Sequence, residues 1–83
     1  MSYTVVWATT AERKLAELWL DAEDRNALSA AADQVEAILR ANPEQSGESR
    51  FSDRRILIVP PLVVIYRCAA LDRMVHVLTL WRL

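Results

Sequence analysis

Arginine side chains surround an apolar stretch in the second half of the chain, RRILIVPPLVVIYR, which runs from Arg54 to Arg67. A planar guanidinium group can hold a phosphate or a carboxylate through two parallel hydrogen bonds. The arginines that could line one side of a sheet for this purpose are Arg50, Arg54, Arg55, Arg67 and Arg82. We expect them to bind a macromolecule. The alternative is that they are solvated strand ends and that Glu48 pairs with Arg50.

Two residues of the same half, His76 and Tyr66, could carry protons. Cleavage of RNA would need a base, an acid and cations, and arginine is a poor acid or base because it stays protonated. His76 lies in MVHVLTL among apolar neighbours, which favours a structural histidine. Tyr66 alternates with Leu62 and Val64, so we expect its ring in the core and its hydroxyl at the edge. The sequence therefore disfavours a nuclease.

A short strand and two helices are predicted in the first half of the chain. YTVVW, from Tyr3 to Trp7, is β-branched and aromatic and predicts the strand. Thr9, with Glu12 three residues later, fits a capping box that starts a helix. An acidic stretch, Asp21 to Asp24, separates this helix from a second one. Apolar residues recur at helical spacing up to Leu39 in the second helix, which should end at Asn42, before Pro43.

Three strands are predicted after a loop that runs from Asn42 to Ser49. They are Arg54–Val59, Leu62–Ala69 and Met74–Trp81, separated by turns at Pro60-Pro61 and from Ala70 to Arg73. The order strand, helix, helix, strand, strand, strand predicts an α+β fold. In this fold a helical hairpin packs on one face of a mostly antiparallel sheet.

Both faces of the predicted hairpin at Pro60-Pro61 are apolar, whereas a half-exposed antiparallel sheet alternates apolar with polar residues. Two helices can cover only one face of a sheet. We therefore expect another chain to cover the second face; the alternative is a surplus of core residues. The apolar residues that we assign to this interface are Leu57, Val63, Ile65 and Trp81.

Length and composition restrict the class of protein. The 83 residues predict one domain, residues 1–83. One cysteine, Cys68, allows no internal disulfide, and without a cysteine cluster we expect no metal and no cofactor. We find neither a signal peptide nor an apolar run near the roughly 20 residues that span a membrane. The sequence thus predicts a cytoplasmic protein without membrane contact.

Charge is distributed unevenly along the chain. Residues 1–48 hold nine acidic and four basic residues, whereas residues 49–83 hold two acidic residues and six arginines. The net charge is therefore −5 in the first part and +4 in the second. A basic half is typical of a surface for phosphate or for an acidic partner. The alternative is that helices collect Glu and Asp while short strands do not.

Three stretches, ANPEQSGESR, RRILIVPPLVVIYR and VHVLTLWR, together with the order of elements, resemble the RelE/ParE family of bacterial type II toxins. The resemblance implies a helical hairpin on a curved antiparallel sheet and an antitoxin, encoded beside the toxin, that wraps it. RelE-like members cut messenger RNA in the ribosome, and ParE-like members act against DNA gyrase.

The sequence departs from the RelE-like pattern at the residues that serve cleavage. Pro61-Leu62-Val63 stands where those members have a Gly-Tyr-Arg type turn, so valine replaces the arginine. The resemblance therefore favours a ParE-like or degenerate toxin that binds a macromolecular target. The second hypothesis is a ribosome-dependent messenger RNA endonuclease that uses Arg55, Arg67 and Arg82. The third is a non-toxic module of the same fold that forms a homodimer through its apolar face.

Overall fold

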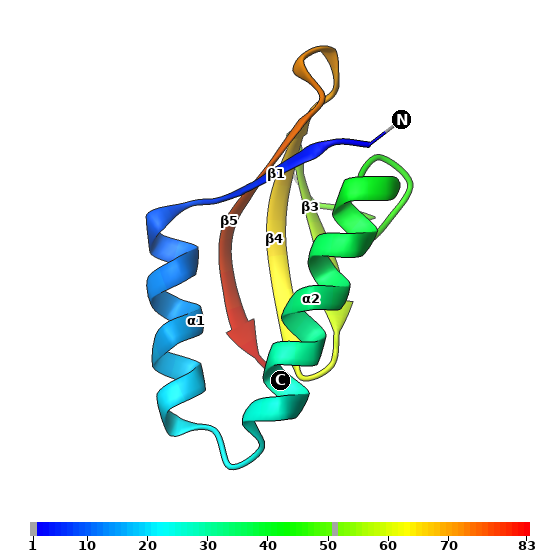
Figure 1. Cartoon of the computed structure of the whole chain (residues 1–83). Coiled ribbons are helices and arrows are strands. Elements are labelled where there is room, and N and C mark those ends of the chain that lie inside the picture. Colours follow the sequence, from blue (N-terminus) through cyan, green and yellow to red (C-terminus); the bar gives the residue numbers. More distant parts are fainter. Residues whose placement is uncertain (1, 51) are drawn as a thin grey trace.

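A computed structural model describes residues 2–50 and 52–83 of the chain (Figure 1). Its elements are, in chain order, β1 (Thr4–Trp7), α1 (Thr9–Asp21), α2 (Arg25–Ala41), β2 (Glu48–Ser49), β3 (Arg54–Val59), β4 (Leu62–Ala69), the 3-10 helix η1 (Ala70–Asp72) and β5 (Met74–Arg82). Every helix and strand predicted from the sequence is present, and the predicted bounds differ from those observed by at most one residue.

The five strands form one sheet in the order β1-β5-β4-β3-β2. β5 pairs with β4, β4 with β3, and β3 with β2, all antiparallel, whereas β1 pairs with β5 in parallel. α1 lies along β5, and α2 crosses in front of β3 and β4 (Figure 1). The fold is α+β, as predicted, and the parallel pair makes the sheet mixed.

Both helices pack against the same side of the sheet. α2 buries Leu28, Ala31, Val35 and Leu39, which recur every three or four residues and so share one face of the helix. α1 is less deeply packed, because Ala11 is the one residue of this helix that is buried. The strand residues that meet the helices in the core are Leu57, Val59, Leu62, Val64, Tyr66, Val75, Val77 and Leu80.

The two helix starts differ in how they are capped. Asp24 caps α2, since its side chain accepts a hydrogen bond of 3.0 Å from the backbone N–H of Ala27. The capping box predicted at Thr9 and Glu12 is wrong. Ala8 occupies the N-cap position, with no side-chain cap. The N–H of Ala8 donates to the carbonyl of Val77 at 2.9 Å, which ties the start of α1 to β5.

Tyr66 connects the sheet to the segment that follows α2, as expected for a ring in the core with its hydroxyl at the edge. The residue is fully buried, and its hydroxyl lies 2.8 Å from the carbonyl oxygen of Pro43 and 2.6 Å from that of Ser46. The hydroxyl has one proton, which the two oxygens share. Burial raises the pKa of the Tyr66 phenol, and the nearby guanidinium of Arg55 offsets part of this rise.

Replacement of Tyr66 by phenylalanine should lower the free energy of unfolding by about 1–3 kcal/mol, because the buried carbonyls lose their donor. The wild type should also lose stability as the pH rises above 10.0, the ordinary pKa of tyrosine, since only the unfolded phenol ionises there. Urea unfolding between neutral pH and pH 11 would measure both effects. Tyr66→Phe should show the weaker pH dependence; an equal slope in both proteins would contradict the assignment.

Candidate interaction surface on the open side of the sheet

The side of the sheet that faces away from the helices is lined by residues from all five strands, and we call it the open face. Cross-strand partners point to the same side of a sheet. The open face therefore follows from the register of the pairs that lie outside the core. Its members are Thr4, Val6, Glu48, Arg54, Ile56, Ile58, Val63, Ile65, Arg67, Ala69, Met74, His76, Thr79 and Trp81.

One end of the open face is apolar. Ile58 pairs with Val63, and Val63 pairs with Trp81 on its other side. Ile58 is 55% exposed and Trp81 is 39% exposed, whereas Val63 is only 3% exposed although it does not belong to the core cluster. Ile58 and Trp81, the two cross-strand neighbours of Val63, cover the Val63 side chain. Large apolar side chains thus remain in contact with water on the side without helices.

The other end of the open face is basic. Arg54 lies directly opposite Arg67, and Arg67 lies directly opposite His76 on β5. Like charges in directly opposite positions destabilise a sheet. The carboxylate of Asp53, 3.8 Å from the guanidinium of Arg67, offers partial compensation, because both side chains are about half exposed. The arrangement suits an anionic group that both guanidinium groups can hold.

Two of the predicted site residues, Arg55 and Leu57, lie on the helix side of the sheet instead. Leu57 is buried in the core opposite Val64. Arg55 donates hydrogen bonds from Nε to the carbonyl of Ser46, at 3.0 Å, and from Nη2 to that of Gly47, at 3.3 Å. Alternation along β3 explains both positions, since Arg54, Ile56 and Ile58 point the other way. The structure gives Arg55 a role in holding the loop after α2.

The remaining two arginines differ in their distance from Arg54. Arg50 lies beside it, because the backbone N–H of Arg50 donates to the carbonyl of Arg54 at 3.0 Å. The side chain of Arg50 forms an ion pair of 3.4 Å with Glu48, the alternative that the sequence offered for it. Arg82 lies opposite Leu62, which faces the core, at the far end of β5. Leu62 and Arg67 are five positions apart on β4, a separation of about 17 Å. The structure therefore does not bring Arg55, Arg67 and Arg82 together.

His76, which the sequence offered as one of two possible proton carriers, lies beside Arg67, and we call Arg54, Arg67 and His76 the basic row. We expected a structural histidine because of its apolar neighbours. The structure places it on the open face, half-buried, between Arg67 and Val6. Strand alternation was the available signal, because Val75 and Val77 on either side both point into the core.

Two further features of the described residues restrict the chemistry. No group of three or more His, Cys, Asp or Glu residues within 2–50 and 52–83 is placed to hold a metal ion. Neither helix in this part of the chain has the length and apolarity that crossing a bilayer requires. Cys68 is half-buried, and burial raises the pKa of its thiol above the ordinary value, which makes it a weak nucleophile.

Comparison with known proteins gives matches in structure alone. No protein-family model matches the sequence, and no curated protein does. A chain of the toxin–antitoxin complex RelBE2 from Mycobacterium tuberculosis superposes with a TM-score of 0.84 at 21% identity, over 100% of this chain and 93% of that one. A chain of the chromosomal ParDE system of P. aeruginosa gives a TM-score of 0.76 at 15% identity, over 98% and 96%. TrmO from Pseudomonas aeruginosa gives 0.64 at 21% identity, over 96% of this chain but only 35% of that one.

The chain therefore has the RelE/ParE-like fold, as the sequence resemblance predicted. Two of these solved structures are toxin–antitoxin systems, and this chain matches almost the full length of the superposed chain in each. At these levels of identity the likeness defines the fold, and the function has to be argued from the residues of the site.

Proposed function

We propose that this protein is the toxin of a bacterial toxin–antitoxin pair, that it acts by binding a macromolecule, and that its cognate antitoxin covers the open face. The observation that carries the proposal is the open face itself, which places exposed Ile58 and Trp81 at one end and the opposed Arg54 and Arg67 at the other. Its fold, shared with chains of two toxin–antitoxin structures, supports the same reading.

A protein partner fits both ends of this surface. Exposed aromatic and branched aliphatic side chains are typical centres of protein interfaces, and tryptophan and arginine are the commonest residues of high binding energy. An antitoxin segment with apolar residues followed by a carboxylate would bury Ile58 and Trp81 and would neutralise the repulsion between Arg54 and Arg67. The partner would thus stabilise the feature of the sheet that is unfavourable in the free protein.

RNA cleavage is the second candidate, and the position of His76 beside Arg67 is the observation that favours it. A histidine can exchange a proton near neutral pH, and the arginine could hold the phosphate. Against it, Arg55 holds the loop after α2 and Arg82 lies at the far end of β5, so the site assumed from the family resemblance is not assembled. We therefore favour binding over cleavage.

Induced expression should arrest bacterial growth, and co-expression of the cognate antitoxin, which we expect to be a small acidic protein encoded next to this gene, should restore growth. An Ile58→Asp variant should lose at least about tenfold in affinity for that protein, because a charge replaces an exposed apolar contact at the interface. Leu71→Asp is the matched control, since Leu71 is another exposed apolar side chain but lies in η1, outside the open face.

The same experiment distinguishes the candidates. Arrest with intact messenger RNA and a DNA-damage response would support gyrase as the bound target. Cleaved messages that disappear with His76→Gln would support the nuclease. Absence of arrest, together with a homodimer in sedimentation that Ile58→Asp dissociates, would overturn the toxin and leave a self-associating module.

A further inference from the structure

The basic row crosses the open face from β3 to β5. Arg54 lies directly opposite Arg67, and Arg67 lies directly opposite His76. Neighbouring strands are about 4.8 Å apart, so the row is about 10 Å long. The two arginines carry a fixed positive charge, whereas a histidine gains or loses its charge near neutral pH. The total charge of the row therefore depends on pH.

Carboxylates of the protein itself leave most of this charge uncompensated. Asp53 lies 3.8 Å from the guanidinium of Arg67, but both side chains are about half exposed, and such pairs contribute little. Glu48 also lies on the open face, and it pairs with Arg50 at 3.4 Å. In the part of the chain that the structure describes, the first and last members of the row form no ion pair. The row can therefore accept a further anion.

The other neighbours of His76 bring no charge close to it on the open face. Its partner on β1 is Val6, which is apolar. The turn before β5 holds two charged residues, Asp72 and Arg73. Asp72 belongs to η1, beyond the end of the strand, and the guanidinium of Arg73 stacks over the ring of Tyr3 at 5.5 Å. The middle guanidinium of the row is thus the charge that lies directly opposite the imidazole.

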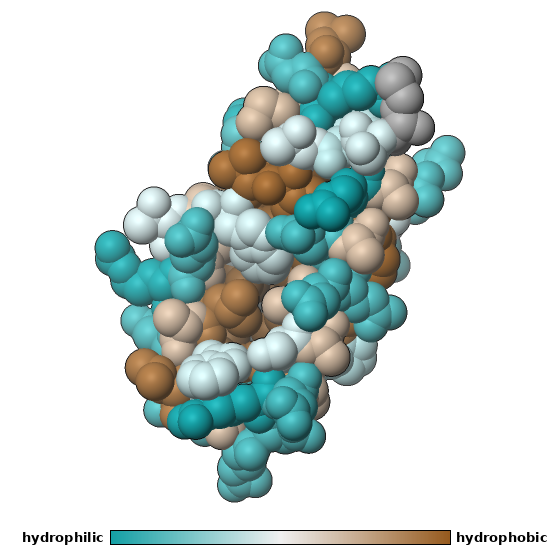
Figure 2. Space-filling model, viewed as in Figure 1, coloured by the Kyte–Doolittle hydropathy of each residue, from teal (hydrophilic) through white to brown (hydrophobic). Residues whose placement is uncertain are grey.

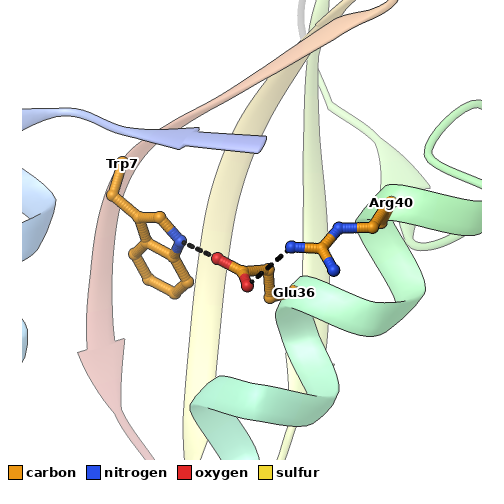
Figure 3. A network of polar contacts seen from close by, with 3 residues as sticks. All are labelled: Trp7, Glu36 and Arg40. Atoms are coloured by element: carbon orange, nitrogen blue, oxygen red, sulfur yellow. Dashed lines mark hydrogen bonds and ion pairs between the residues drawn. The ribbon is translucent and has the colours of Figure 1, made fainter. Parts of the chain in front are cut away.

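The sheet separates the basic row from the charged residues of the helices. Figure 2 shows the helix side, where hydrophilic side chains surround a recessed hydrophobic surface. On this side Trp7 donates from Nε1 to Oε1 of Glu36 at 3.1 Å, and Arg40 holds the other carboxylate oxygen at 3.0 Å (Figure 3). This network joins β1 to α2 and so keeps Val6, the neighbour of Trp7 in the chain, beside His76. The carboxylate of Glu36 does not neutralise the row, because it lies across the sheet.

We propose that the basic row binds two neighbouring carboxylates of an extended partner segment and that His76 takes up a proton as they bind, an inference that rests on the proposed function. One carboxylate would lie between Arg54 and Arg67, and the other between Arg67 and His76. Acidic residues at alternate positions of an extended segment point to the same side, about 7 Å apart, within the length of the row.

Proton uptake follows from the chemistry of the third member. A protonated imidazole offers a charge and two N–H donors, whereas the neutral ring offers one donor and no charge. The second carboxylate therefore binds the protonated form of His76 more tightly. Because binding effects between two sites are reciprocal, the acidic segment favours the proton as much as the proton favours the segment. Partner binding should thus tighten as the pH falls towards 5.5, where glutamate is still ionised.

The chain has one histidine, so the imidazole signal in an NMR spectrum reports on His76 alone. The probe is a short synthetic peptide with two leucines followed by two glutamates at alternate positions, and its control carries glutamine in place of glutamate. The glutamate peptide should raise the protonated fraction of His76 at pH 7 by about twofold or more. The glutamine peptide should leave it unchanged. This measurement uses the wild type and does not depend on how a variant folds.

Affinities at two pH values complete the test. The wild type should bind the glutamate peptide about three- to tenfold more tightly at pH 5.5 than at pH 8, the effect of one added charge at a partly exposed site. His76→Gln should bind it equally at both pH values. His76→Lys, which keeps its charge, should bind tightly at pH 8 as well.

Three results would overturn the inference. Binding at pH 8 that does not tighten on acidification would remove the role of His76 and leave the proposed function intact. Absence of peptide binding at both pH values would also overturn it, whereas growth arrest tests the proposed function separately. If a single-stranded oligonucleotide binds with the pH dependence that His76→Gln removes, and the peptide does not, the anion is a phosphate and the carboxylate partner is wrong.

Discussion

Exchange of both Arg54 and Arg67 for glutamate should abolish growth arrest and lower the affinity for an anionic partner by about a hundredfold or more. Each arginine can contribute a charge-assisted, two-pronged hydrogen bond, worth about 1.5–3 kcal/mol, and reversal of both charges also adds repulsion. The fold should survive, because both side chains are exposed on β3 and β4 and neither is part of the core. Growth of induced cultures and calorimetric titration would measure the two effects.

A matched control is available on α1. Arg13→Glu with Lys14→Glu changes the net charge by the same amount on exposed residues away from the open face, and it should leave arrest and affinity unchanged. The single change Arg67→Ala should keep or slightly raise stability, because it removes one of two opposed like charges. Full toxicity of the Arg54/Arg67 double variant, or an equal loss with Arg82→Glu alone, would contradict the assignment of the basic row.

Replacement of Gly47 by alanine should lower the free energy of unfolding by about 3 kcal/mol or more, the largest stability effect that we expect from a single methyl group. Gly47 has φ of +65°, in the left-handed region that alanine rarely adopts. A Cβ atom there would collide with the carbonyl oxygen of Ile56 and lie 3.3 Å from the hydroxyl of Tyr66. β2 would have to leave β3, and the loop that Tyr66 and Arg55 hold would move with it.

Ser52→Gly is the opposite and matched change. Ser52 also has positive φ, 57°, where glycine is preferred, so this variant should be neutral or more stable by up to about 1 kcal/mol. Urea unfolding of the wild type, Gly47→Ala and Ser52→Gly would measure these differences in the free energy of unfolding. A domain of this size has roughly 4–12 kcal/mol of stability in total. If the free energies of unfolding of Gly47→Ala and the wild type differ by less than about 0.5 kcal/mol, the positive φ at Gly47 is not the constraint that the geometry indicates.

Local pattern was sufficient to predict most elements of the fold. Helical spacing of apolar residues located α2, and β-branched residues with the Pro60-Pro61 turn located β3 and β4. β2 was missed because two residues, Glu48 and Ser49, carry no periodicity. They form a strand only because Ile56 and Arg55 present a free edge to them. The parallel pairing of β1 with β5 was also not predicted, since it joins segments about 70 residues apart.

For the candidate site, too, some features could be predicted from local sequence pattern and others depend on contacts between distant segments. The sequence alone predicts the fold class, the arginines around the apolar hairpin and an excess of apolar strand residues, because composition and spacing are properties of the chain. Only the tertiary structure decided which side each residue takes. Strand register placed Arg55 and Leu57 on the helix side of the sheet and His76 beside Arg67. Register and helix placement depend on contacts between distant segments, which no local pattern contains.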